Sequence, residues 1–332
     1  MSAINLQGMN FRIQELRAVA VVAVVFYHAN ESVSPNGYLG VDVFFLISGY
    51  LVIPKMQSAI GAGNLRQFYL DRFYRLTPAL IGMLLICLFF VLTFAKWSGI
   101  SDFVNQAIFS LLYVGNFSAV LISGDYFSPD GFAPLIHLWS LSAEVQMYLF
   151  LPLIMLINKK FLYSSIAITS FLIFIFSPLF STDLNTWFFY MIFSRFWEFM
   201  LGGLLAKLIT VRKIHVAIWK PFFYTLTLLL LMPLQINKVI YTILIVLFTS
   251  LCLVSSNVIS NRRNIWTLLG DRSYSIYLYH LPLMYVAKFT PVIYGTNREI
   301  YTVLSIITSL VLAEISYRFI ENHFRSSGRK NA

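Results

Sequence analysis

An arginine and a histidine bracket the first apolar run of the chain. Arg17 and His28 are separated by ten residues, all of them Ala, Val, Phe or Tyr. Eleven helical positions rise about 16 Å and complete very nearly three turns, so both side chains are expected on one helix face. A neutral imidazole takes up a proton near physiological pH, which makes His28 a candidate general base. The alternative is that His28 is a polar packing residue between helices.

Two further arginines suggest an anion site. Arg72 and Arg75 lie one helical turn apart in "FYLDRFYRLTPAL", in a stretch that is expected to be a cytoplasmic loop before an apolar run that begins at Pro78. The guanidinium fork matches the oxygens of a phosphate, so this pair could clamp a phosphorylated ligand. Alternatively, both arginines are topology signals.

Several other polar residues stand inside apolar runs, where they are costly unless they are paired or functional. Glu144 is a carboxylate that needs a partner, and Arg195 and Glu198, at i and i+3, are expected to neutralise each other. The remaining candidates for an acceptor path or for links between helices are Asp42, Ser48, Trp139, Tyr274 and His280. Cys87 and Cys252 each lie in an apolar run, so neither a disulfide framework nor a metal site is expected.

The elements that must position these residues are membrane-spanning helices. The chain is 58% hydrophobic and 11% charged, whereas an ordinary soluble domain carries roughly a quarter charged residues. This balance predicts an all-α, polytopic membrane protein. The net charge of +10 is then explained by Lys and Arg in cytoplasmic loops, so no nucleic-acid partner is expected.

About ten apolar runs are long enough to cross a hydrocarbon layer of about 30 Å. They cover residues 12–30, 37–54, 77–95, 137–157, 161–180, 186–208, 216–235, 238–259, 265–289 and 299–320. If both termini are cytoplasmic, most of the 24 Lys and Arg residues fall on the cytoplasmic side. The exceptions are Lys96, Lys238, Lys288 and Arg298 outside and Arg195 within a span. This distribution agrees with the positive-inside rule.

An eleventh run, 103–122, is weaker because it carries two asparagines, a glutamine and a glycine. If it were a crossing, the basic pairs at 159–160, 212–213 and 262–263 would move outside, against the positive-inside rule. Segment 96–136 is therefore expected to be external and to contain an interfacial or re-entrant helix.

Several stretches, taken in order, resemble the acyltransferase-3 family of bacterial membrane enzymes. These stretches are Arg17-x10-His28, "GVDVFFLISGYL", Arg72-x-x-Arg75 before a proline, "HLWSLSAEVQMY", "RFWEFMLGG", "SYSIYLYHLPL" and "YRFIENHFR". Members of this family O-acetylate or otherwise acylate lipopolysaccharide O-antigens, exopolysaccharides and other envelope glycans. The resemblance covers residues 11–325. It implies a single membrane acyltransferase domain over residues 1–332, located in the bacterial cytoplasmic (inner) membrane.

The resemblance also implies roles for individual residues. His28 would be catalytic together with Arg17, Arg72 and Arg75 would bind the donor, and Glu144 would belong to the site. Acetyl-CoA, or another acyl-CoA, would be a co-substrate rather than a bound cofactor. Its phosphates would lie at the cytoplasmic arginines and its thioester near His28, which would act as general base on a glycan hydroxyl while Glu144 orients the imidazole. A covalent acyl-histidine is the competing chemistry.

Two departures from the family pattern bear on these expectations. Many members carry a fused extracytoplasmic SGNH-type domain. No such soluble domain is visible here, so the protein is expected to act alone or with a separate extracytoplasmic partner. In addition, the motif around Arg72 and Arg75 often contains more basic residues in other family members, whereas here Asp71 and Phe73 flank Arg72. This difference concerns the affinity for the donor.

Two other function classes fit a membrane protein with interior charges. A glycan-lipid flippase or transporter would use them to line a polar path, but no paired half-sequences that would indicate an inverted repeat are visible. A glycan polymerase or ligase would favour large basic external loops, whereas the largest external segment expected here is acidic. The favoured interpretation is therefore acyl transfer to a glycan or lipid-linked glycan, by a protein whose helices are surrounded by membrane lipid.

Overall fold

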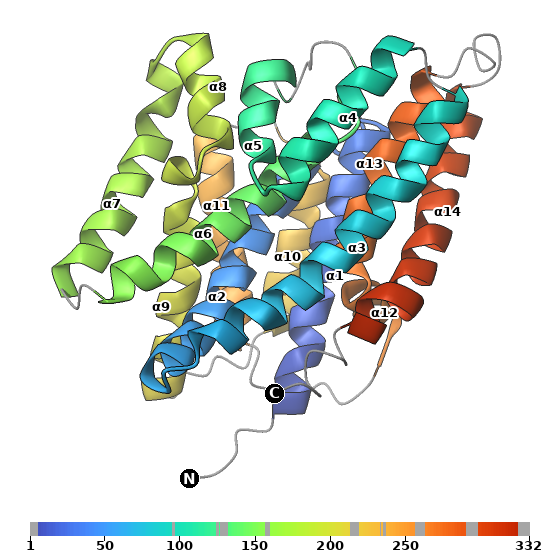
Figure 1. The fold of residues 1–332 in the computed structure, drawn as a ribbon. Coiled ribbons are helices and arrows are strands. Elements are labelled where there is room, and N and C mark those ends of the chain that lie inside the picture. Colours follow the sequence, from blue (N-terminus) through green and yellow to red (C-terminus); the bar gives the residue numbers. More distant parts are fainter. Residues whose placement is uncertain are drawn as a thin grey trace. The chain divides into compact units, whose positions relative to one another are not determined.

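The computed structural model describes residues 6–94, 97–123, 126, 132–156, 160–212, 219–232, 234, 237–255, 263–289 and 298–324. All regular secondary structure in these ranges is helical (Figure 1), which confirms the predicted all-α class. The chain divides into two compact units, and each is described by itself. The first unit comprises Met1–Ser58, Lys159–Ile175 and Arg195–Ser273, and the second comprises Ala59–Asn158, Phe176–Ser194 and Tyr274–Ala332.

The first unit contains the helix that carries Arg17 and His28. Its elements are α1 (Leu6–Ala29), η1 (Gly37–Leu39), most of α2 (Gly40–Gly61), α7 (Lys160–Phe176), α9 (Phe196–Arg212), α10 (Trp219–Leu231), α11 (Lys238–Ser255) and α12 (Ile265–Asp271). No glycine or proline falls between Met9 and Ser34, so nothing in the sequence breaks α1 before its end.

Glycines let α2 approach two other helices backbone to backbone. A Cβ atom at Gly40 would lie 2.4 Å from the carbonyl oxygen of Ala20 on α1. A Cβ atom at Gly49 would lie 1.9 Å from the carbonyl oxygen of Phe199 on α9. Both distances are too short for any side chain, so α2 contacts α1 and α9 at positions that only glycine can occupy.

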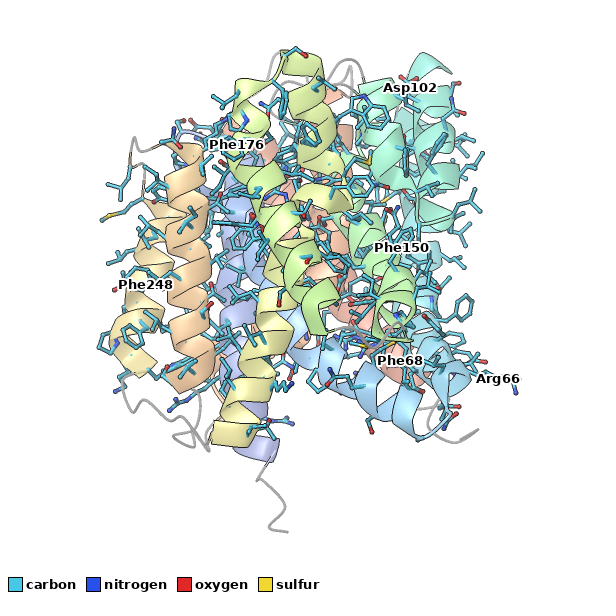
Figure 2. All side chains as sticks on the ribbon, turned by 90° about the vertical axis from the view of Figure 1, so that its left-hand side faces the viewer. Arg66, Phe68, Asp102, Phe150, Phe176 and Phe248 are labelled. Atoms are coloured by element: carbon cyan, nitrogen blue, oxygen red, sulfur yellow. The ribbon has the colours of Figure 1, made fainter. Side chains whose placement is uncertain are left out.

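The second unit contains the helix that carries Arg72 and Arg75. Its main helices are α3 (Leu65–Phe94), α4 (Trp97–Leu111), α5 (Gly115–Ser118), α6 (Trp139–Leu156), α8 (Thr182–Tyr190), α13 (Ser273–Phe289) and α14 (Arg298–Ser316). Shorter turns are η2 (Ala119–Ser123), η3 (Ile136–Leu138), η4 (Ser177–Leu179), η5 (Ile192–Ser194) and η7 (Tyr317–Glu321). Figure 2 shows Arg66 and Asp102 at opposite ends of this unit, an arrangement compatible with the predicted cytoplasmic and external sides.

Five helices are long and apolar enough to cross a membrane by length and composition. They are Gly37–Gly61, Leu65–Thr93, Ile136–Met155, Lys238–Ser255 and Glu299–Phe324, and Ser164–Leu179 is a shorter apolar helix. Large apolar side chains such as Phe150 and Phe176 are about half exposed, as expected for lipid-facing positions (Figure 2). The chain is therefore a membrane protein, while the count of about ten spans and the cytoplasmic termini stay predictions.

Two predicted spans are not single helices. The run 186–208 is divided, because α8 ends at Tyr190 and α9 begins at Phe196 after a 3-10 turn. The run 265–289 is divided at Arg272, whose backbone N–H bonds to Leu269 and closes α12. Residues 191–193 at the first break are as apolar as the helices, so hydropathy did not show it. At the second break, Asp271, Arg272 and Ser273 are polar, but they were too few to divide the long apolar run.

The interrupted run 103–122 is also not one helix. It contains the end of α4, a turn in which Tyr113 adopts a left-handed φ of 55°, then α5 and η2. The candidate spans found among the described residues do not include it, but they also omit several predicted spans, so the external position of this run stays a prediction. Lys96, Asp125 and Asp130, which were part of the predicted external segment, lie outside the described residues.

Candidate functional site

Arg17 and His28 lie on one uninterrupted α-helix. This confirms the continuous helix on which their predicted position on one face depends. His28 is half-buried near the end of α1, and its Nδ1 lies 3.0 Å from the carbonyl oxygen of Val24. A carbonyl only accepts, so Nδ1 carries the hydrogen and donates it. In the neutral ring, Nε2 is then the nitrogen with the lone pair, as a general base requires. The ring also meets that of Tyr27 edge to face, with centroids 5.1 Å apart.

Three turns away, Arg17 is half-buried and donates from Nη1 to Oε1 of Gln14 at 3.3 Å. Buried polar contacts anchor the part of α1 that precedes Arg17. Arg12 donates to the carbonyl of Ser255 at 2.6 Å and lies over the ring of Trp219, and Glu15 accepts from Asn264 at 2.6 Å. Arg12 was predicted only as a topology signal, but it is 6% exposed and anchors α1.

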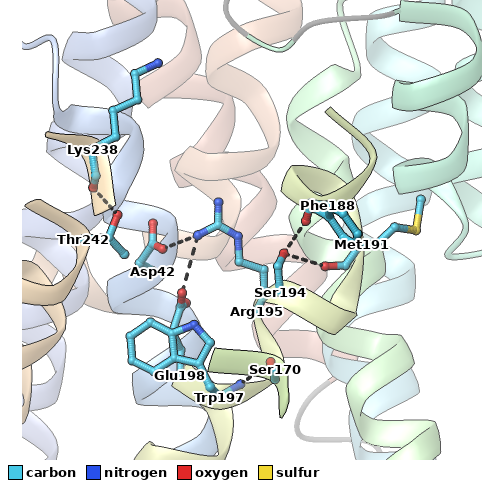
Figure 3. Close-up of polar contacts among 10 residues, drawn as sticks. All are labelled: Asp42, Ser170, Phe188, Met191, Ser194, Arg195, Trp197, Glu198, Lys238 and Thr242. Atoms are coloured by element: carbon cyan, nitrogen blue, oxygen red, sulfur yellow. Dashed lines mark hydrogen bonds and ion pairs between the residues drawn. The ribbon is translucent and has the colours of Figure 1, made fainter. Parts of the chain in front are cut away.

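A buried ion triad occupies the junction of α2 and α9 in the first unit (Figure 3). Arg195 Nη1 lies 2.6 Å from Oδ1 of Asp42 and 3.4 Å from Oε1 of Glu198. The predicted pairing of Arg195 with Glu198 is confirmed, and Asp42 is the closer partner that the sequence did not reveal. The available signal was that Asp42 and Arg195 are opposite charges, each inside an apolar run. Ser48, half-buried on α2 beside Gly49, stays a candidate without an assigned role.

In the second unit, Arg72 and Arg75 lie inside α3 and not in a loop before it, so that prediction is wrong. No residue between Leu65 and Thr77 breaks a helix, and Gln67 donates to Asp71 at i, i+4 with 2.8 Å. Pro78 is an interior residue of the same helix. The proline removes one backbone donor, and a membrane helix tolerates such a gap when neighbouring groups contact the freed backbone.

Arg72 is positioned by aromatic rings. Its guanidinium carbon lies 5.4 Å from the centroid of the Phe68 ring and 5.7 Å from that of Tyr148 on α6, within the range of cation–π attraction. The Tyr148 hydroxyl donates a short hydrogen bond to Glu144, and the carboxylate of Glu144 lies within Coulombic range of Arg72. Glu144 and the arginine pair therefore form one cluster, the arginine cluster, on α3 and α6.

Tyr274 of α13 joins the arginine cluster. Its hydroxyl donates to the carbonyl of Leu76 at 2.7 Å. Leu76 directly follows Arg75 and lies one helical turn after Arg72. Arg75 and Glu144 are among the charges within range of the Tyr274 hydroxyl. The structure thus brings together four residues that the sequence had singled out separately: Arg72, Arg75, Glu144 and Tyr274.

Trp139 and His280 lie in a second buried region of the same unit. The ring of His280 packs edge to face on that of His137, with centroids 5.0 Å apart, and the Tyr277 hydroxyl donates to the carbonyl of His137 at 2.5 Å. Trp139 packs against the rings of Phe189 and Tyr190. His137 was not singled out as a site residue, although it belongs to a motif quoted above. It is fully buried and packs among these rings, which its polarity alone did not indicate.

The two units thus present different chemistry. The first offers an imidazole with a proton-accepting nitrogen and a cation three turns away on the same helix. The second offers two arginines one turn apart with a carboxylate and a phenol. Among the described residues, no group of three or more His, Cys, Asp or Glu side chains is arranged to hold a metal ion.

Known proteins match almost the whole chain. Residues 11–318 match the acyltransferase-3 family model, described as an acyltransferase domain. The O-acetyltransferase OatA of Staphylococcus aureus (strain NCTC 8325 / PS 47) is 29% identical over 345 residues, covering 95% of this chain and 57% of the relative. A second S. aureus protein (strain COL), provisionally named an O-acetyltransferase, is 32% identical over 360 residues with the same coverage. The chain therefore spans little more than half of the length of these relatives, and no solved structure matches it.

Proposed function

The chain belongs to the acyltransferase-3 family, and on this premise we propose that it is a membrane O-acyltransferase. The donor is proposed to be acetyl-CoA, or another acyl-CoA, reaching the protein from the cytoplasm. The acceptor is proposed to be a hydroxyl of an envelope glycan or lipid-linked glycan outside the bacterial cytoplasmic membrane. The family match over residues 11–318, with relatives named as O-acetyltransferases, is the observation that carries the reaction class.

The arginine cluster supports the assignment of the donor site. Coenzyme A carries several phosphate groups, and two guanidinium groups one turn apart can each form charge-assisted hydrogen bonds with phosphate oxygens. The rings of Phe68 and Tyr148 contact the Arg72 guanidinium and restrict its freedom, so less freedom is lost when a phosphate binds.

The tautomer of His28 supports its role as general base. Because Nδ1–H donates to the Val24 carbonyl, Nε2 takes the proton of the acceptor hydroxyl as its oxygen attacks the thioester carbonyl. The C–O bond forms, the C–S bond breaks, and the proton passes from Nε2 to the departing thiolate. Arg17 lies about 16 Å from His28 along the same helix, and its role beside the histidine stays a prediction. That Glu144 orients the imidazole stays a prediction.

The experiment compares envelope glycans from cells that lack the gene with glycans from complemented cells. NMR should show a base-labile acyl group only in the complemented cells. Complementation with His28→Ala should give glycan without the acyl group at normal protein abundance. Phe26→Ala should restore the acyl group, because Phe26 is exposed and lies two residues before His28, on nearly the opposite face of α1. Normal acylation by an abundant His28→Ala protein would refute the role of the histidine. Unchanged glycans in the deletion strain would refute the proposed acceptor class.

A further inference from the structure

The buried ion triad of the first unit has one carboxyl group more than it has cations. Asp42 is 2% exposed, Arg195 is 5% exposed and Glu198 is fully buried, so water screens none of the three appreciably. If both carboxyl groups were ionised, a net negative charge would remain inside an apolar part of a membrane protein. Such a charge is costly unless it is neutralised.

The neighbours of the triad do not supply the missing positive charge. Figure 3 shows the side chain of Lys238 extending away from the triad, while its backbone carbonyl accepts a hydrogen bond from Thr242. Phe174 offers its ring to the guanidinium, with the Arg195 carbon 5.9 Å from its centroid. Among the residues that the structure describes, the other titratable groups within range are the phenol of Tyr38 and, around it, Tyr241 and Glu31. A phenol is neutral near neutral pH and a carboxylate adds negative charge, so none of these groups neutralises the triad.

The two carboxyl groups share one guanidinium nitrogen, which shows where a proton can reside. Asp42 Oδ1 and Glu198 Oε1 both contact Arg195 Nη1, so the two carboxyl groups lie close together around a single cation. Two ionised carboxylates in such a site repel each other, and a proton on one of them removes this repulsion. In addition, Oε2 of Glu198 is buried, and no donor among the described residues reaches it.

We propose that Asp42 and Glu198 hold one proton between them and that the triad is a buried proton-binding site. The two distances assign the proton mainly to Glu198. The contact of 2.6 Å from Arg195 to Asp42 has the length of a charge-assisted bond to an ionised carboxylate, whereas the contact of 3.4 Å to Glu198 is long for one. With the proton in place the triad is neutral, and it links α2 to α9 close to the Gly49–Phe199 contact. This inference does not depend on the proposed function.

Infrared spectroscopy tests the proposal on the full chain in lipid nanodiscs at neutral pH. The wild-type protein should show the C=O stretch of a protonated carboxylic acid, displaced when the carboxyl carbons of Asp and Glu are labelled with ¹³C. Glu198→Gln, which keeps the shape of the protonated acid, should remove this band. Glu314→Gln should keep it, because Glu314 is partly exposed and paired with Arg318 on α14.

The wild-type spectrum is decisive even if the variants do not accumulate. Absence of the protonated-acid band from the wild-type protein at neutral pH would overturn the proposal. A band that persists at full intensity in Glu198→Gln, or that Glu314→Gln removes equally, would also overturn it. Loss of the band in Glu198→Gln alone would support a proton held at the triad. Asp42→Asn should alter the frequency of the band, because the ionised group that shares Arg195 with Glu198 is replaced by a neutral amide.

Discussion

The donor site predicts how acyl-CoA binding responds to changes around Arg72. Arg72→Ala removes a guanidinium that can form a charge-assisted hydrogen bond with a phosphate, which contributes about 1.5–3 kcal/mol. The dissociation constant should therefore rise by about tenfold to about a hundredfold. Arg72→Lys should give a smaller loss, since lysine keeps the charge but lacks the planar fork.

The aromatic support of Arg72 makes a second, smaller contribution that the same assay can separate. Tyr148→Leu removes a ring 5.7 Å from the guanidinium carbon, a cation–π contact of about 1 kcal/mol, or about fivefold in affinity. Tyr148→Phe keeps the ring and loses only the hydrogen bond to Glu144. It should therefore bind acyl-CoA more tightly than Tyr148→Leu does.

Binding of acetyl-CoA by isothermal titration calorimetry, with the purified protein in nanodiscs, measures these effects without the chemical step. Arg66→Ala is the matched control, because Arg66 lies on the same helix but is exposed and projects from the end of α3 (Figure 2). The reasoning would be refuted if Arg72→Ala bound acetyl-CoA like the wild type, or if Arg66→Ala lost as much affinity as Arg72→Ala.

Two further predictions concern the first unit. Inserting one alanine between Val21 and Val22 turns His28 by about 100° relative to Arg17; glycan acylation, read by NMR, should then be lost, and retained acylation would contradict the one-face argument. Gly49→Ala should lower the thermal unfolding temperature in detergent, because the new Cβ atom would lie 1.9 Å from the Phe199 carbonyl oxygen and overpacking costs typically about 1–3 kcal/mol. Gly61→Ala on the same helix, where nothing lies within 4 Å, should leave the unfolding temperature unchanged, and equal effects of both changes would contradict the close approach.

What the sequence predicted well were relations within one helix. The shared helix of Arg17 and His28 and the pairing of Arg195 with Glu198 depend only on helical spacing, and both are found in the structure. The contact of Arg195 with Asp42 joins residues 153 positions apart, so it depends on how α2 packs against α9 and no spacing rule reveals it.

Other errors have local causes. Arg72 and Arg75 were placed in a loop because basic residues are typical of cytoplasmic loops and a proline is typical of the first turn of a helix. The proline instead lies within α3. The first residues of α3 contain no helix breaker, and a neighbouring helix provides the Tyr274 hydroxyl to the backbone near Pro78. The sequence therefore located the arginine pair but not its surroundings, which come from α6 and α13.

The glycine contacts of α2 set a limit on how the protein can be recombined with its relatives. Where a carbonyl oxygen occupies the place of a Cβ atom at Gly40 and Gly49, no side chain lies between the helices to absorb a mismatch. A chimaera that takes α2 from one relative and α1 or α9 from another must match backbone paths directly and cannot be repaired by repacking side chains. We expect exchanges that move α1, α2 and α9 together to yield stable protein, and exchanges that separate them to fail even when every residue at the junction is apolar.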